Sequence, residues 1–117
     1  MKQSLLKSKS FLFAVRVIGL SKHVREKQKE FDISRQVLRS GTAIGALVRE
    51  AVQAESKRDF IHKLSISLKE SSETEYWLEL LFASKLITEP IYKSLLADCQ
   101  ELLRLLVSSI KTCKLNL

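Results

Sequence analysis

The chain has 117 residues, enough for one domain with a single core, and 45% of them are hydrophobic. Three glycines and one proline supply too little turn material for an all-β fold, so the composition predicts an all-α protein. The net charge of +7 is uneven, because residues 1–30 carry eight Lys or Arg against two Glu and the rest of the chain is nearly balanced.

Two helices are predicted in the first half of the chain from the spacing of its apolar residues. The first is expected from about residue 8 or 10 to residue 29, with one apolar stripe and with basic residues on its other faces. That stripe consists of Phe13, Val17, Leu20 and Val24. The second helix should begin after Phe31, with Asp32 or Ser34 as its N-cap.

Two more helices are predicted in the second half. The third should begin just after Ser56, whose side chain can accept a hydrogen bond from the backbone N–H of Asp59, and should end near residue 86 or 87. Thr88 is the predicted N-cap of the fourth, with Pro90 in its first turn. Short loops join antiparallel neighbours, so we expect the whole chain to form one up-and-down four-helix bundle.

Small residues interrupt the apolar stripes of the two middle helices. In the second helix these are Ser40, Gly41, Ala43, Gly45 and Ala46, and in the third they are Ser67, Ser71 and Thr74. Each glycine costs about 1 kcal/mol of helix propensity relative to Ala. Such a cost indicates that neighbouring helices approach closely there.

Few residues fit a catalytic or metal site. A di-metal site in a bundle needs Glu-x-x-His pairs, and no Glu in this sequence is followed three residues later by His. Glu70 and Glu73 share a helix face and could hold a metal or act as an acid–base pair, but such glutamates more often bond to Arg at an interface. His23 and His62 stand alone. The sequence therefore predicts no metal, no cofactor and no enzymatic activity.

The two cysteines and the longest apolar run bear on location. Cys99 and Cys113 would lie about 20 Å apart on one helix, too far for an intrachain disulfide. Reduced thiols are typical of cytosolic proteins. The apolar run 11–20 is too short to span a membrane and is interrupted by Arg16. We expect a cytoplasmic protein with no membrane partner.

Basic residues near the end of the first helix and the start of the second form a candidate nucleic-acid site. They are Arg16, Lys22, Arg25, Lys27, Lys29, Arg35 and Arg39. Aligned cations recruit phosphates by counterion release, and without an aromatic motif the binding should be weakly sequence-specific. The alternative is that these side chains only solvate a helix face and complement its negative C-terminal end.

A longer motif lies between Leu38 and Leu81, LRSGTAIGALVREAVQAESKRDFIHKLSISLKESSETEYWLELL. It resembles the signature of the bacterial large-subunit ribosomal RNA intervening-sequence proteins, most specifically at residues 40–42, 50–51, 56–60, 69–70 and 73–78. The resemblance implies a bundle that assembles into a ring-like homopentamer. It also implies kinship with accessory proteins of diversity-generating retroelements, which bind nucleic acid and a reverse transcriptase. This chain departs from the pattern at Ala43 and Leu47, where relatives tend to have Ser and Asn.

Two functional hypotheses remain. The chain is either a homo-oligomeric module that binds RNA or DNA, or an interaction scaffold whose basic face meets an acidic protein. A wide apolar face on the fourth helix, together with Ile66, Trp77 and Leu80 on the third, predicts an oligomer rather than a monomer. The residues assigned to packing or to the subunit interface are Glu70, Glu73, Tyr76 and Trp77.

Overall fold

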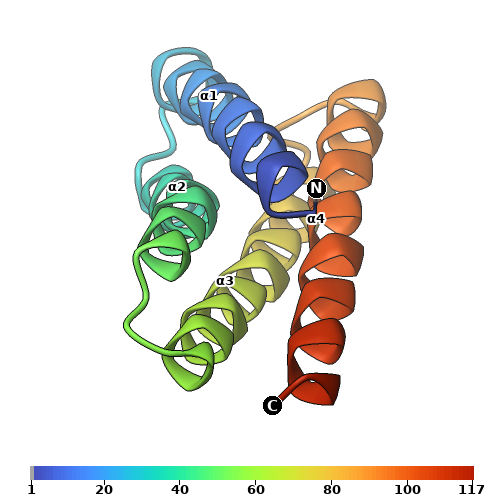
Figure 1. The fold of residues 1–117 in the computed structure, drawn as a ribbon. Helices are drawn as coiled ribbons and strands as arrows, with labels where there is room; N and C mark the ends of the chain where they lie inside the picture. Colours follow the sequence, from blue (N-terminus) through green and yellow to red (C-terminus); the bar gives the residue numbers. More distant parts are fainter. Residues whose placement is uncertain (1) are drawn as a thin grey trace.

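Four helices make up most of the computed structural model, which describes residues 2–117 (Figure 1). They are α1 (Lys2–Gln28), α2 (Asp32–Val52), α3 (Lys57–Ala83) and α4 (Glu89–Leu115). No strand occurs among the described residues, which confirms the all-α prediction. Each helix packs against the next one in sequence and α4 packs against α1, whereas no Cα atoms of the diagonal pairs come within 8 Å of each other in residues 2–117. This is the packing of a four-helix bundle.

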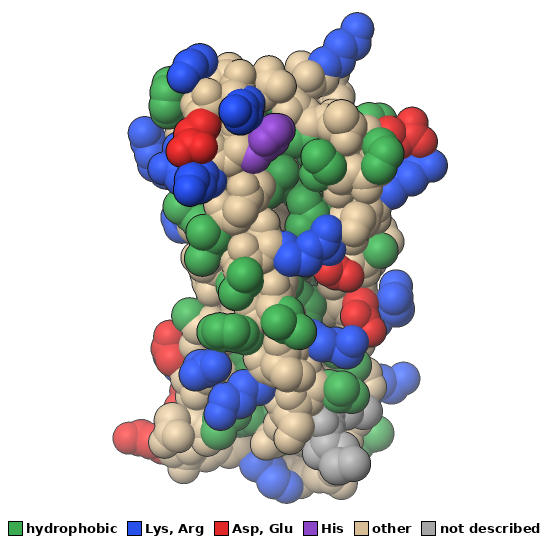
Figure 2. All heavy atoms as spheres, turned by 90° about the horizontal axis from the view of Figure 1, so that it is seen from above, with side chains coloured by type: hydrophobic (Ala, Val, Ile, Leu, Met, Phe, Trp, Pro, Cys, Tyr) green, Lys and Arg blue, Asp and Glu red, His purple; other side chains and the backbone are tan. Residues whose placement is uncertain are grey.

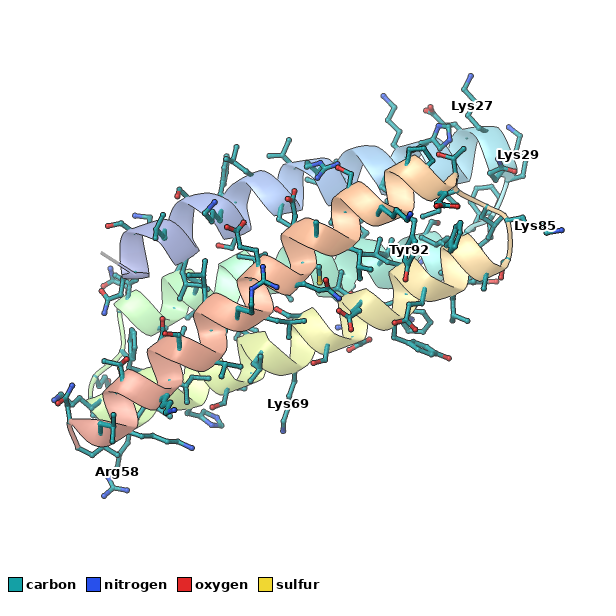
Figure 3. All side chains as sticks on the ribbon, turned by 90° about the vertical axis from the view of Figure 1, so that its right-hand side faces the viewer. Lys27, Lys29, Arg58, Lys69, Lys85 and Tyr92 are labelled. Atoms are coloured by element: carbon teal, nitrogen blue, oxygen red, sulfur yellow. The ribbon has the colours of Figure 1, made fainter. Side chains whose placement is uncertain are left out.

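Contact between the helices is uneven around the bundle. The α1–α2 and α2–α3 pairs pack most extensively, and the α1–α4 pair packs least. Figures 1 and 3 show that α1 and α4 are inclined to each other. The bundle is therefore tight around α2 and loosest along the side that α1 and α4 share.

The predicted close approach of the middle helices is confirmed. A Cβ atom on Gly41 would lie 2.7 Å from Val17 Cγ1, so the absence of a side chain at this position lets α1 and α2 meet. On the other side of α2, Thr74 Oγ1 donates a hydrogen bond to Ser40 Oγ at 2.9 Å. Ser67 Oγ donates to the carbonyl oxygen of Ile44 at 3.0 Å. These buried hydroxyls have partners, so small polar residues bring the backbones together at little desolvation cost.

The helix ends agree with the sequence only in part. The Ser56 side chain accepts a bond from the Asp59 N–H at 3.0 Å, as predicted. Thr88 occupies the N-cap position of α4, but its side chain makes no capping bond. The prediction for α1 was wrong at its start, because the helix begins at Lys2. Leu6, one turn into this extra segment, is only 1% exposed, so burial against the rest of the bundle holds the early turns.

The N-cap predicted for α2 was also wrong. Phe31 occupies the cap position, and neither Asp32 nor Ser34 caps the helix. Instead, the Glu30 carboxylate accepts bonds from the backbone N–H groups of Asp32, Ile33 and Ser34 at 2.9–3.1 Å. A carboxylate is stabilised there by the positive end of the helix as well as by three donors. The charge of Glu30 is thereby engaged with α2.

The outer surface of α1 differs from the expectation that it would be basic. We define the α1 apolar face as Leu5, Phe11, Leu12, Val15 and Ile18, which are 45–62% exposed. Figure 2 shows hydrophobic side chains along this surface, with Lys and Arg at both ends and also beside acidic side chains near its middle. Ile66, Trp77 and Leu80 on α3 are half-buried instead, so the larger exposed apolar surface lies on α1. Within residues 2–117, no helix is both long and apolar enough to cross a membrane.

Candidate nucleic-acid interface

Five of the predicted phosphate contacts cluster around the turn between α1 and α2. Lys22, Arg25 and Lys27 lie on the last two turns of α1, Lys29 lies in the connection, and Arg35 lies on the first turn of α2. All five side chains are exposed, and none belongs to a salt bridge formed among the described residues. Their charges therefore face solvent.

Lys85 joins this cluster from the other half of the chain. It lies in the connection between α3 and α4, with φ of 62°. Figure 3 shows Lys85 at the same end of the bundle as Lys27 and Lys29. We call the six residues the basic end: Lys22, Arg25, Lys27, Lys29, Arg35 and Lys85. The sequence reasoning missed Lys85, although an up-and-down bundle necessarily brings its first and third connections to one end.

Exposed carboxylates share this part of the surface but do not outnumber the cations. Glu26 and Asp32 are exposed in the same segment. Glu30 keeps its negative charge, which is partly offset because its carboxylate accepts the backbone N–H groups at the positive end of α2. Within residues 22–35, the charges are five cations against three carboxylates. The surface is therefore basic, and its cations suit a binding mode in which several weak phosphate contacts act together.

Arg16 is engaged elsewhere. Its guanidinium pairs with the Asp98 carboxylate and donates to Ser94 Oγ at 2.8 Å, both on α4. Lys9 pairs with Glu101 at 3.2 Å one turn away on α4. These ion pairs connect the two helices that pack least. We therefore leave Arg16 out of the candidate interface.

Arg39 is likewise engaged within the bundle. It pairs with Glu70 at 3.3 Å and with Glu73, joining α2 to α3. The hydrogen bond to Glu73 is the main cause that raises the pKa of Arg39 above its ordinary value. Burial alone would raise the pKa of Glu73, but hydrogen bonds from Arg39 and Trp77 outweigh burial and lower it. The cluster keeps its charges at neutral pH and holds Arg39 away from a phosphate role.

The two aromatic residues beside this cluster lie in different environments. Trp77 is half-buried, and its indole N–H donates to Glu73 Oε1 at 3.1 Å. Tyr76 is 53% exposed and meets the Trp77 ring edge-on, with centroids 5.0 Å apart. Trp77 thus belongs to the packing between α2 and α3. Tyr76 lies beside it on the exposed surface.

Groups suited to catalysis are scattered. No set of three or more His, Cys, Asp or Glu side chains within residues 2–117 is placed to hold a metal ion. His23 and His62 are exposed on different helices. Cys99 is buried, and burial, followed by the nearby charges of Glu75 and Asp98, raises its pKa to about 12. A thiol with that pKa stays protonated and is a poor nucleophile at neutral pH.

Comparison with known proteins places the chain among relatives of the same shape. A crystal structure of a protein of unknown function from the S23 ribosomal protein family of Bacteroides thetaiotaomicron is 54% identical, with a TM-score of 0.94. The match covers 95% of this chain and 99% of that one. None of the curated proteins compared with the chain matches it. The family model for the 23S rRNA-intervening sequence protein matches residues 2–108, and the chain therefore belongs to that family.

Proposed function

We propose that this chain is a non-enzymatic, homo-oligomeric protein that binds the backbone of RNA or DNA through its basic end. The observation that carries the proposal is the grouping of six exposed cations at one end of the bundle. They come from two connections far apart in sequence, and no salt bridge among the described residues uses them. The name of the family refers to ribosomal RNA, which agrees with a nucleic-acid role.

The chemistry predicts how such binding behaves. Each phosphate that Lys or Arg neutralises releases counterions, so the affinity should fall steeply as salt rises. Contacts of this kind position the protein without reading bases, so unrelated sequences should bind alike. Arg16 and Arg39 are excluded from the contact set because their guanidinium groups already serve helix packing.

Self-assembly forms the second part of the proposal. Between Phe11 and Gly19, α1 is apolar on its outer as well as its inner side, apart from Arg16, which turns toward α4. A helix that is apolar all round is normally buried. We assign the α1 apolar face to contacts between subunits, and the homopentamer implied by the family resemblance is the preferred assembly. Several basic ends on one particle would convert weak phosphate contacts into useful affinity.

A charge-reversal experiment tests the nucleic-acid assignment. We expect the triple variant Lys22→Glu, Arg25→Glu and Lys29→Glu to fold normally, because all three side chains are exposed. It should weaken binding to unrelated RNA and duplex DNA together, and its salt slope should fall by about 2 to 3, since each lost contact removes 0.7 to 0.9. The matched control is Lys69→Glu, Lys111→Glu and Lys114→Glu, which changes the net charge equally at exposed positions away from the basic end.

The outcome also decides between the two functional classes. Loss of affinity in the first variant and not in the control would support a localised phosphate site. Equal affinity of wild type and both variants in low-salt mobility-shift titrations would refute the assignment. The alternative function, an oligomeric scaffold that docks an acidic protein partner, would then be preferred.

A further inference from the structure

An aromatic side chain stands among the cations of the basic end. Phe31 occupies the N-cap position of α2, and 52% of it is exposed. Within residues 2–117, the ring–ring contacts join Tyr76 to Trp77 and Phe82 to Tyr92, so Phe31 is not used in an aromatic pair there. A side chain this exposed adds little to the core of the bundle. Its ring is available to a ligand.

Two of the cations already assigned to phosphates lie close to Phe31 in sequence, beyond the carboxylates Glu30 and Asp32 that flank it directly. Lys29 precedes it by two residues in the same connection, and Arg35 follows it by four. Phe31 immediately precedes the first turn of α2, and Arg35 lies in that turn. Both cations are exposed. One exposed ring and two exposed cations thus lie within residues 29–35, at the turn between α1 and α2.

The backbone that carries this ring is held firmly on both sides. The Glu30 N–H reaches the carbonyl oxygen of Val24 at 3.5 Å, and the Glu30 carboxylate accepts three N–H groups at the start of α2. Ser34 Oγ donates to the Glu30 carbonyl oxygen, and Ser21 Oγ donates to the Ser34 carbonyl oxygen, both at 2.9 Å. Phe31 therefore projects from an ordered turn. Little backbone freedom remains to be lost on binding.

We infer that Phe31 is a base-stacking platform and that the basic end takes single-stranded nucleic acid in preference to duplex. This inference rests on the proposed function and specifies its substrate. Proteins that bind single strands combine cations that follow the backbone with aromatic rings on which bases stack, and the stacking tolerates any base. Bases inside a duplex are already stacked on one another. Only a strand with accessible bases can use the ring and the cations at once.

Substitutions of Phe31 test the inference in the full-length protein. The probe is a mixed-sequence RNA oligonucleotide of about 20 nucleotides, used alone and annealed to its complement, with binding followed by fluorescence anisotropy. Phe31→Ala should weaken single-strand binding by about 5- to 150-fold, the range found for loss of one stacked base. Duplex binding and the salt slope should stay unchanged, because the cations remain. Phe31→Trp should retain the affinity, and Phe31→Leu should lose it despite being apolar.

Val52→Ala is the matched control, since Val52 is an exposed apolar residue at the other end of α2. It should bind both probes like the wild type. Full single-strand affinity in Phe31→Ala, or full affinity in Phe31→Leu, would overturn stacking. If the Lys22, Arg25 and Lys29 reversal still weakened both probes, the backbone site would stand without the ring. Absence of wild-type binding to either probe at low salt would overturn both the inference and the proposed function.

Discussion

The contact between α2 and α3 and the contact between α1 and α4 are held together by different interactions. Helix α3 is joined to α2 by buried hydroxyl pairs such as Thr74 with Ser40, and by the ion pairs of Arg39 with Glu70 and Glu73. Toward α4, α1 relies on surface ion pairs and packs least. Outward, α1 presents apolar side chains, whereas the outer surface of α3 is largely polar.

In the proposed assembly, this difference separates the surfaces used for folding from the surface used for contacts between copies. On the α2–α3 side, the polar groups bond to one another within the chain, so a partner has few polar groups left to bind there. The α1 side leaves apolar surface exposed that a monomer has no use for. We infer that α2 and α3 supply most of the specificity of the fold, and that α1 is kept available for contacts between copies.

The largest effect should come from placing charge on the α1 apolar face. The double variant Leu12→Glu and Val15→Glu should convert an assembly of several times 13.4 kDa into a monomer with unchanged helix content, because both residues are exposed in the isolated chain. Burying two unpaired carboxylates at an interface is strongly unfavourable. Sedimentation at micromolar concentration measures the outcome.

Val107→Glu is the control for this prediction. Val107 is 51% exposed on α4, the helix on which the sequence pattern had placed the surplus apolar surface. Its assembly should match that of the wild type. Dissociation by Val107→Glu, with the α1 double variant still assembled, would return the interface to α4, and a monomeric wild type would remove the assembly proposal altogether.

Features set by neighbouring residues were predictable from the sequence, and features set by distant partners were not. The Ser56 cap was predicted because both of its groups lie within one turn. The engagement of Arg16 and Arg39 was missed, since their partners lie 82 and 31 to 34 residues away. The Glu30 carboxylate was missed as the acceptor for the first N–H groups of α2, because Glu30 lies before the N-cap residue Phe31 and Glu is not a favoured capping residue. Lys85 could have been found by following the bundle topology through to its ends.

A smaller effect should distinguish Gly41, which lies on α2 and packs against the inner side of α1, from Gly19, which lies on the outer side of α1. Gly41→Ala would place a Cβ atom 2.7 Å from Val17 Cγ1 in the packed contact between α1 and α2. Because a β-branched neighbour moves little, we expect a loss of about 1–3 kcal/mol in the free energy of unfolding. Urea denaturation measures this value. An unchanged or increased stability would contradict the close packing of α1 on α2.

Gly19→Ala is the matched substitution on the outer side of α1. A Cβ atom there meets nothing within 4 Å in the isolated chain. If nothing covers the site, the better helix propensity of Ala should add about 0.5–1 kcal/mol. In the assembly, a loss of subunit affinity with a normal monomer fold would instead place a neighbouring copy close to Gly19. Gly41→Ala therefore tests the packing on the inner side of α1, and Gly19→Ala tests the packing on its outer side.

The smallest effect concerns the acid sensitivity of the α2–α3 side. Burial opposes ionisation of Glu73, but the hydrogen bonds from Arg39 and Trp77 hold its pKa below the ordinary value of 4.5. Since the folded pKa is lower than the unfolded one, the carboxylate contributes stability above about pH 4.5 and loses it as the pH falls through the folded value. Because the pair is partly exposed, the contribution should be about 1 kcal/mol or less.

Urea unfolding of wild type and Glu73→Gln between pH 7 and pH 3 measures this contribution. The difference in unfolding free energy should be constant from pH 7 to about pH 5 and should shrink below that, because protonation makes the wild-type side chain resemble Gln. Glu55→Gln is the control, since Glu55 is exposed and belongs to no salt bridge formed among the described residues. A Glu73→Gln difference that stays level down to pH 3 would show that the carboxylate charge of Glu73 does not hold α2 to α3.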